Sequence, residues 1–174
     1  SKPFLDAAAR AGIAVHTDGR IVVDECQHTA ADGVFALGDV SSPYQLKHVA
    51  NHEARVVAHN LVHPESLREV DHRHVPAAVF TYPQIASVGF TEDQVRAQRV
   101  PYLCATQAYG DTAYGWAMED TTGICKVVAD PRTGRLLGAH LMGPQASSLI
   151  QPLIQGISLG QTVREIARGQ YWIR

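Results

Sequence analysis

The sequence lacks the features that mark secreted and membrane-spanning proteins. Its three cysteines, Cys26, Cys104 and Cys125, are odd in number and far apart, so they form neither a disulfide framework nor a CxxC pair. No apolar run approaches the roughly 20 residues that a membrane-spanning helix needs, and the first residues lack the layout of a signal peptide. We therefore expect a cytoplasmic protein with buried, reduced thiols and no membrane partner.

The sequence also lacks a strong excess of either charge. The net charge is −2, and residues 1–70 hold six Lys/Arg against nine Asp/Glu, while the remaining residues hold nine against eight. Neither part has the basic excess that neutralises a phosphate backbone, so nucleic acid is excluded as an expected partner. The residues that are present, 45% apolar and 18% charged, are typical of a globular protein.

A polar segment at residues 62–73, with Pro64 and scattered charges, predicts a linker. We expect it to separate an incomplete α/β piece at residues 1–70 from a second domain at residues 71–174. The apolar run at residues 34–37 lacks alternation, which predicts a strand covered on both faces, as in a parallel sheet. The other elements expected before the linker are a helix over 5–11 that ends at Gly12, a strand over 19–24, and a helix over 45–61 capped by Ser41 or Ser42. So few elements cannot bury their faces alone.

After the linker the pattern predicts an α+β fold, a small antiparallel sheet with flanking helices. The clearest feature is a hairpin whose two apolar strands are joined by the turn at residues 130–134. Capping boxes at residues 91–94 and 162–165 predict two helix starts. The expected strands cover residues 77–80, 85–88, 103–109, 124–129 and 136–142, and the longer expected helices cover residues 91–98 and 145–159.

The most informative stretch is residues 29–39, Thr-Ala-Ala-Asp-Gly-Val-Phe-Ala-Leu-Gly-Asp. A buried strand there ends in Gly38, which lets a ligand approach the backbone closely. Asp39 then offers a carboxylate that accepts hydrogen bonds from sugar-like hydroxyls. The next helix starts a few residues later, so its free N–H groups and positive dipole end are expected to point into the same crevice. The pattern suits a cofactor with a polyhydroxyl chain and a head group that becomes negative on reduction.

This stretch resembles the second FAD-binding motif of the class I pyridine nucleotide-disulfide oxidoreductases. The resemblance implies that Asp39 holds the ribityl chain of FAD. It also implies that the backbone at the start of the following helix approaches the flavin pyrimidine, where the helix dipole stabilises the anionic reduced flavin. The candidate cofactor-binding residues are Gly38, Asp39, Gln45, Leu46, Lys47 and His48.

The remainder resembles the dimerisation domain of the same family. The resemblance is carried by residues 75–92 and by residues 138–143 with the apolar helix that follows, and it implies a homodimer formed through residues 75–173. Independently, residues 136–163 contain no charged residue, which is an interface signal. The same pattern also fits a helix wrapped inside a larger monomer. The predicted core stripe of this helix is Ala146, Leu149, Ile150, Leu153, Ile154 and Ile157, and its polar, uncharged face is Ser147, Ser148, Gln151, Gln155 and Ser158.

Residues 46–55 and 167–173 resemble the branch of this family that reduces mycothiol disulfide in actinobacteria. That resemblance implies hydride transfer from NADPH to FAD and electron transfer through a CxxxxC disulfide to a low-molecular-weight disulfide, with a His–Glu pair of the partner subunit handling the protons. The first GxGxxG, the CxxxxC pair and the nicotinamide domain are absent from the sequence, and Arg174 stands where the family has its His-Pro. We therefore expect a fragment of a longer enzyme that is inactive alone, has no catalytic residue of its own and binds FAD weakly at most.

Two alternatives stay open: a stand-alone dimerisation or binding module without flavin, or another flavin oxidoreductase of the same superfamily. Four histidines, His48, His52, His59 and His63, fall near one helix face at a spacing that can chelate metals. No carboxylate or thiol completes a ligand set with them, so no metal site is expected.

Overall fold

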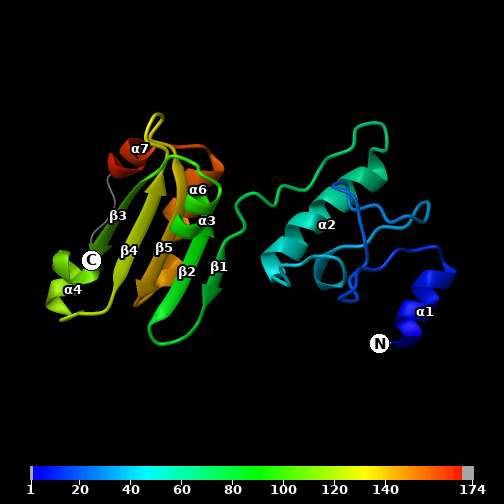
Figure 1. Cartoon of the computed structure of the whole chain (residues 1–174), viewed down its shortest axis with the longest axis horizontal. Helices are drawn as coiled ribbons and strands as arrows, with labels where there is room; N and C mark the ends of the chain where they lie inside the picture. Colours follow the sequence, from blue (N-terminus) through cyan, green and yellow to red (C-terminus); the bar gives the residue numbers. More distant parts are fainter. Residues whose placement is uncertain (1, 170–174) are drawn as a thin grey trace. The chain divides into compact units, whose positions relative to one another are not determined.

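The computed structural model describes residues 2–169. The chain divides into two compact units, residues 1–72 and residues 73–174, and each is described by itself (Figure 1). No helix among the described residues is long and apolar enough to span a membrane. The position after Ile173, where the family resemblance places the catalytic histidine, lies outside the described residues.

The first unit contains two helices joined by loops and a short 3-10 turn. They are α1 (Lys2–Arg10), η1 (Gly38–Val40) and α2 (Lys47–Val62). α1 ends as predicted, because Gly12 has a φ of +71° and the Ile13 N–H donates to the Ala8 carbonyl at 2.9 Å. α2 packs through one face, whose buried residues are Val49, Glu53, Val56, Val57 and Asn60.

The two strands predicted in this unit, at residues 19–24 and 34–37, do not form. These segments make only isolated antiparallel bridges, Val15 with Ile21 and His28 with Phe35. Extended backbone becomes a strand only where a neighbour pairs with several successive residues, and no described segment of this unit does so. Val34 is 39% exposed, so the prediction of a strand covered on both faces is also wrong for this structure.

The predicted cap of α2 is wrong as well. The helix begins at Lys47, and its N-cap residue Leu46 makes no side-chain hydrogen bond to the helix end. Ser41 and Ser42 are instead buried in the preceding turn, where their N–H groups donate to the Gly38 carbonyl at 3.0 and 2.7 Å. The turn thus uses the two serines that could have capped the helix, and no side chain caps the first turn of α2.

The second unit has the predicted α+β fold, with an open antiparallel sheet in the order β1-β2-β5-β4-β3. The strands are β1 (Ala77–Val79), β2 (Gln84–Gly89), β3 (Leu103–Ala108), β4 (Ile124–Ala129) and β5 (Leu136–Gly143). The predicted hairpin of β4 and β5 is confirmed. The Asp130 carboxylate holds its turn by accepting the N–H groups of Arg132 at 2.7 Å and Thr133 at 3.0 Å.

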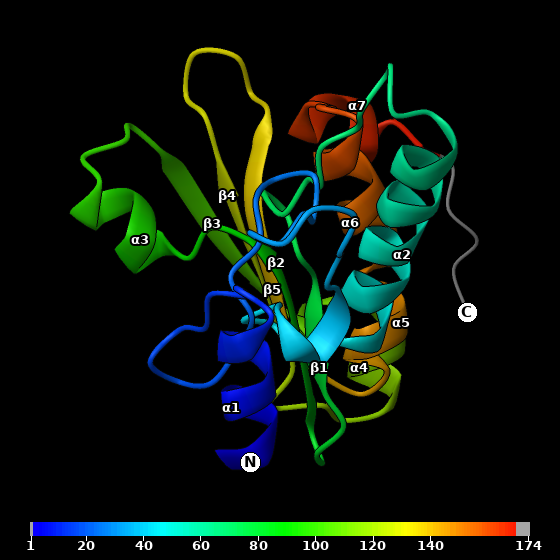
Figure 2. The same ribbon diagram turned by 90° about the vertical axis from the view of Figure 1, so that its right-hand side faces the viewer.

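Helices lie on both faces of this sheet, with α3 on one side and α5, α6 and α7 on the other (Figure 2). The helical elements are α3 (Glu92–Ala97), η2 (Tyr109–Asp111), α4 (Ala113–Ala117), α5 (Ala146–Leu149), α6 (Gln151–Ser158) and α7 (Val163–Ala167). The capping boxes of Thr91 with Gln94 and of Thr162 with Glu165 are confirmed. The short elements η2 and α4, of three and five residues, form where the sequence predicts no helix.

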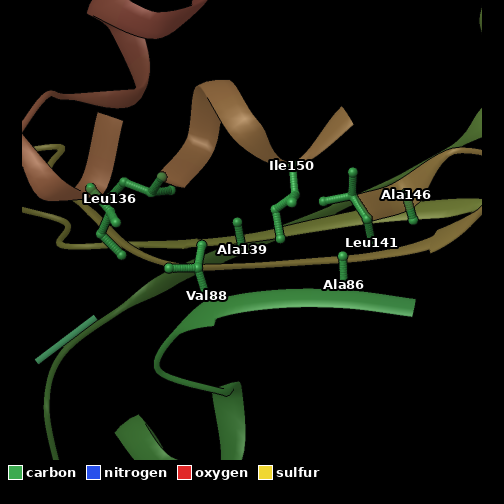
Figure 3. Close-up of a cluster of buried hydrophobic side chains, with 8 residues drawn as sticks. Ala86, Val88, Leu136, Ala139, Leu141, Ala146 and Ile150 are labelled. Atoms are coloured by element: carbon green, nitrogen blue, oxygen red, sulfur yellow. The ribbon is translucent and has the colours of Figure 1, made fainter. Parts of the chain in front are cut away.

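The hydrophobic core of the second unit lies between the sheet and α5 and α6 (Figure 3). Its buried residues are Ala86, Val88, Leu136, Ala139, Leu141, Ala146, Ile150 and Ile157. The single helix predicted over residues 145–159 is divided at Ile150, just before Pro152, which favours a helix start. Because α5 is a single turn, Ala146 and Ile150 face the core there, whereas Leu149, which was also predicted in the core, is 49% exposed.

Replacing Thr162 by Ala should lower the free energy of unfolding by about 1 kcal/mol, because the start of α7 loses its cap. The Thr162 hydroxyl accepts the Glu165 N–H at 3.2 Å and donates to the Glu165 carboxylate at 2.8 Å. Urea denaturation measures the loss. Thr121→Ala, at an exposed position, is the matched control and should change stability by less than about 0.5 kcal/mol. Equal effects of the two substitutions would contradict the capping role.

Candidate functional site

The motif at residues 29–39 folds into a compact loop that Thr29 closes. The Thr29 N–H and hydroxyl both donate to the Val34 carbonyl at 2.9 Å, and the hydroxyl accepts the Ala31 N–H at 3.2 Å. Gly33 takes a φ of +71° at the tip of this loop. Thr29 therefore fixes the entrance of the motif through its own hydrogen bonds, while residues 35–37 carry the chain to Gly38.

Gly38 occupies a position that only glycine fits well. Its φ is +69°, and a Cβ added there would lie 3.3 Å from the Cβ of Ala50 on α2. Its carbonyl accepts the two N–H groups of Ser41 and Ser42. Gly38 therefore allows the turn to pass close against α2.

The N–H of Gly38 is held by Glu53, a residue that the sequence reasoning missed. Glu53 is 1% exposed, and its Oε2 accepts the Gly38 N–H at 2.6 Å. Its other oxygen, Oε1, lies 2.9 Å from Nε2 of His72. A buried carboxylate is tolerated only when both oxygens are hydrogen bonded, and hydrogen bonds to a charged group are short and strong. Glu53 thus connects α2 to the Gly38 turn and to His72.

Asp39 follows Gly38 within η1 and is exposed. Among the described residues its carboxylate has no hydrogen-bond or ion-pair partner, in contrast to the fully bonded Glu53. An exposed, unpaired carboxylate that a rigid turn holds in place can accept hydrogen bonds from the hydroxyls of a ligand.

The remaining predicted residues form the start of α2. Gln45 is exposed and takes a left-handed φ of +50°, which is uncommon for a residue with a side chain. Leu46 is half-buried at the N-cap, and Lys47 and His48 are the first exposed residues of the helix. Because no side chain caps this end, the positive end of the helix dipole is available to an anionic ligand group. The structure therefore presents two elements that suit a cofactor, the Asp39 carboxylate and the uncapped start of α2.

Three of the four histidines near α2 have different hydrogen-bond or ion-pair partners. His52 Nε2 accepts the Asp71 N–H at 3.3 Å, His59 Nε2 donates to the Ser66 carbonyl at 2.9 Å, and His63 Nδ1 lies 3.4 Å from the Glu65 carboxylate.

All three cysteines are free, and Cys104 is exposed, so the prediction of buried thiols is wrong for that residue.

Comparison with known protein families identifies the family of this chain. The family described as "Pyridine nucleotide-disulphide oxidoreductase, dimerisation domain" matches residues 75–171, and the family described as "Pyridine nucleotide-disulphide oxidoreductase" matches residues 2–54. The chain belongs to the pyridine nucleotide-disulphide oxidoreductase family. The family resemblance read from the sequence is thereby confirmed for both parts of the chain.

Individual relatives are similar over nearly the whole chain. Mycothione reductase of Mycobacterium tuberculosis is 64% identical over 174 residues, which cover 98% of this chain and 38% of that protein. Dihydrolipoyl dehydrogenase of Corynebacterium glutamicum is 35% identical over 159 residues, 90% of this chain and 34% of that protein. The chain thus spans little more than a third of the length of these relatives.

Two solved structures have the same fold. LpdA from Mycobacterium tuberculosis superposes with a TM-score of 0.84 at 29% identity, covering 94% of this chain and 36% of that chain. The HOCl-induced flavoprotein disulfide reductase RclA from Escherichia coli gives a TM-score of 0.83 at 30% identity, covering 95% and 38%. The predicted fold class, an α+β dimerisation domain with an antiparallel sheet and flanking helices, is confirmed.

Proposed function

We propose that this chain contributes part of the flavin site and the dimer interface to an FAD-dependent disulfide reductase that uses NADPH to reduce mycothiol disulfide. The observation that carries the proposal is the exposed Asp39 carboxylate on the Gly38 turn, which α2 and Glu53 hold in place. The substrate class is inferred from the 64% identity to a mycothione reductase. The proposal assigns residues 1–70 to the FAD-binding domain and residues 71–174 to the dimerisation domain, without a catalytic residue of their own.

The residues at the turn fit FAD. Asp39 would accept hydrogen bonds from the ribityl hydroxyls, and the absence of a side chain on Gly38 leaves room for the turn against α2. The uncapped start of α2, with Gln45, Leu46, Lys47 and His48, would face the pyrimidine ring. When bound, FAD supplies the redox chemistry between nicotinamide and disulfide. The helix end would favour the negative charge of the reduced ring by about 0.3–1 kcal/mol or more in a partly buried setting.

We also propose that residues 75–173 form a homodimer. An exposed apolar surface in the second unit supports this, since Tyr82 is 98% exposed and Trp116 77% exposed. A cavity of about 730 Å³ opens there, lined in part by Tyr82, Tyr109 and Leu149. Burial raises the pKa of Tyr109 to about 12, and its buried hydroxyl has no partner among the described residues, as expected for a surface that a second subunit completes. The three free thiols suit the reducing cytoplasm.

The flavin assignment is tested on a protein extended to the length of the curated relatives. Asp39→Ala should weaken FAD binding by about 10- to 100-fold, because hydrogen bonds to a charged group contribute about 1.5–3 kcal/mol. Asp32→Ala, at another exposed acidic position of the same motif, is the matched control and should leave the affinity unchanged. The affinity is measured by titrating the apoprotein with FAD and following flavin fluorescence. Equal affinities of the two variants would refute the role of Asp39.

The same protein separates the alternatives. A colourless dimer that binds no FAD would favour a stand-alone dimerisation module. A yellow protein that oxidises NADPH without reducing mycothiol disulfide would favour another flavin oxidoreductase of the superfamily. The 174-residue chain itself is expected to bind FAD weakly and to have no reductase activity.

A further inference from the structure

We propose that Asp24, Cys26 and His28 form a binding site for a borderline-soft divalent metal ion of the Zn²⁺ type. The three residues offer a carboxylate oxygen, a thiol sulfur and an imidazole nitrogen, and these donor atoms all lie within 4.8 Å of one another. The inference does not depend on the proposed flavin function. It concerns a turn that precedes the motif at residues 29–39.

The backbone of this turn is already in place. One oxygen of the Asp24 carboxylate accepts the N–H groups of Cys26 at 2.9 Å and His28 at 2.8 Å. The Asp24 N–H donates to the His28 carbonyl, and the Gln27 N–H donates to the Asp24 carbonyl, each at 3.0 Å. A left-handed φ of +69° at Gln27 completes the turn. Side chains two residues apart are thereby brought to one place, so a metal ion would not have to order the loop.

Contacts outside the turn hold the backbone of Cys26 and the side chain of His28 in position. The Cys26 carbonyl accepts a hydrogen bond from Nδ2 of Asn60 at 3.2 Å, and Asn60 is itself buried on α2. The His28 ring packs against the Phe35 ring, with centroids 4.5 Å apart. Ligands that are positioned by neighbouring contacts lose less conformational entropy when they bind a metal ion.

The distances suit tetrahedral coordination. Bond lengths of about 2.0–2.3 Å to nitrogen, oxygen and sulfur place neighbouring ligand atoms about 3.3–3.8 Å apart. His28 Nδ1 and the second oxygen of Asp24 are already 3.2 Å apart. The remaining separations, at most 4.8 Å, need a closure on the order of 1 Å, which side-chain rotation supplies. Three protein ligands leave a fourth position for water.

The donor set and the charge select the kind of ion. A thiol together with an imidazole favours Zn²⁺ and its transition-metal neighbours over Mg²⁺ and Ca²⁺, which prefer oxygen ligands. The surroundings are negative, because the carboxylates of Asp24, Glu25 and Glu69 lie near the Cys26 thiol. The same negative field attracts a dication. Solvent reaches the site, because the His28 side chain is 33% exposed and that of Asp24 50% exposed.

Titration of the 174-residue chain with Co²⁺, a spectroscopic substitute for Zn²⁺, tests the site. Binding through Cys26 should produce a thiolate-to-cobalt charge-transfer absorption band that Zn²⁺ removes by displacement. Cys26→Ser should abolish the band, and His28→Asn should weaken Zn²⁺ binding by about 10-fold or more, since loss of even an outer-shell partner costs 10- to 100-fold. Cys104→Ser removes an exposed thiol of the second unit and is the matched control that should keep the band.

A second measurement uses the unmodified chain and so avoids any folding defect of a variant. Zn²⁺ should slow the alkylation of Cys26 by iodoacetamide at least 10-fold, while the rate at Cys104, read in the same digest by mass spectrometry, stays unchanged. Absence of the charge-transfer band, its loss in Cys104→Ser, or unchanged alkylation of Cys26 would show that Asp24 and His28 form only an ion-paired turn, and the site would be rejected.

Discussion

Replacing Glu53 by Ala is expected to lower the free energy of unfolding of the first unit by about 2–3 kcal/mol. The substitution removes the acceptor of the Gly38 N–H, whose hydrogen bond is 2.6 Å long, and the partner of His72 at 2.9 Å. Gly38 is buried, so its N–H would be left without an acceptor, and the space of a fully buried side chain would open beside it. Hydrogen exchange of the α2 amides at increasing guanidinium concentration measures the free energy of unfolding of the first unit separately from that of the second.

Two variants show whether the hydrogen bonds cause this effect. Glu53→Gln keeps the shape and one carbonyl oxygen, so it should retain at least half of the stability that Ala loses. Glu65→Ala removes a carboxylate whose side chain is 70% exposed and should cost less than about 0.5 kcal/mol. If Glu53→Ala costs no more than Glu65→Ala, then Glu53 does not hold the turn, and the support for a fixed Asp39 is lost with it.

The accuracy of the sequence predictions differs between the two units for a physical reason. In the second unit the signals are local: short apolar runs, a turn at Asp130 and capping boxes at Thr91 and Thr162 each specify their own element. In the first unit the apolar run at residues 34–37 indicates extended backbone, but a strand also needs a neighbour. Among the described residues this run forms only one isolated bridge, between His28 and Phe35. The local pattern therefore could not predict that no strand forms.

At the candidate site, too, the sequence identifies some residues and misses others. Gly38 and Asp39 stand in a recognisable motif, and the structure places Gly38 against α2 with a φ that favours glycine. Glu53 was missed although the sequence contains a signal for it. A charged residue four positions after Val49 and three before Val56 lies on the buried stripe of the helix, which indicates a buried carboxylate with specific partners. Its partner His72 is 19 residues away and could not be identified from spacing.

Replacing Ile150 by Ala is expected to lower the free energy of unfolding of the second unit by about 2–5 kcal/mol, because the truncation leaves a cavity in a packed core. Ile150 is 2% exposed and lies in the cluster between the sheet and α5 and α6. It sits where the helical path divides, so the cavity also weakens the contact of both helices with the sheet. Chemical denaturation at low protein concentration measures the loss.

Replacing the preceding residue, Leu149, shows whether the loss of stability depends on core packing or only on the apolar character of the side chain. Leu149 is as apolar as Ile150 but is 49% exposed and lines the cavity at the proposed dimer surface. Leu149→Ala should therefore change the stability of the isolated chain by less than about 0.5 kcal/mol, while it weakens self-association measured by sedimentation. Should Leu149→Ala destabilise the chain as strongly as Ile150→Ala, helix 145–159 would be continuous in solution, with both residues in one core stripe, and the division at Ile150 would be wrong.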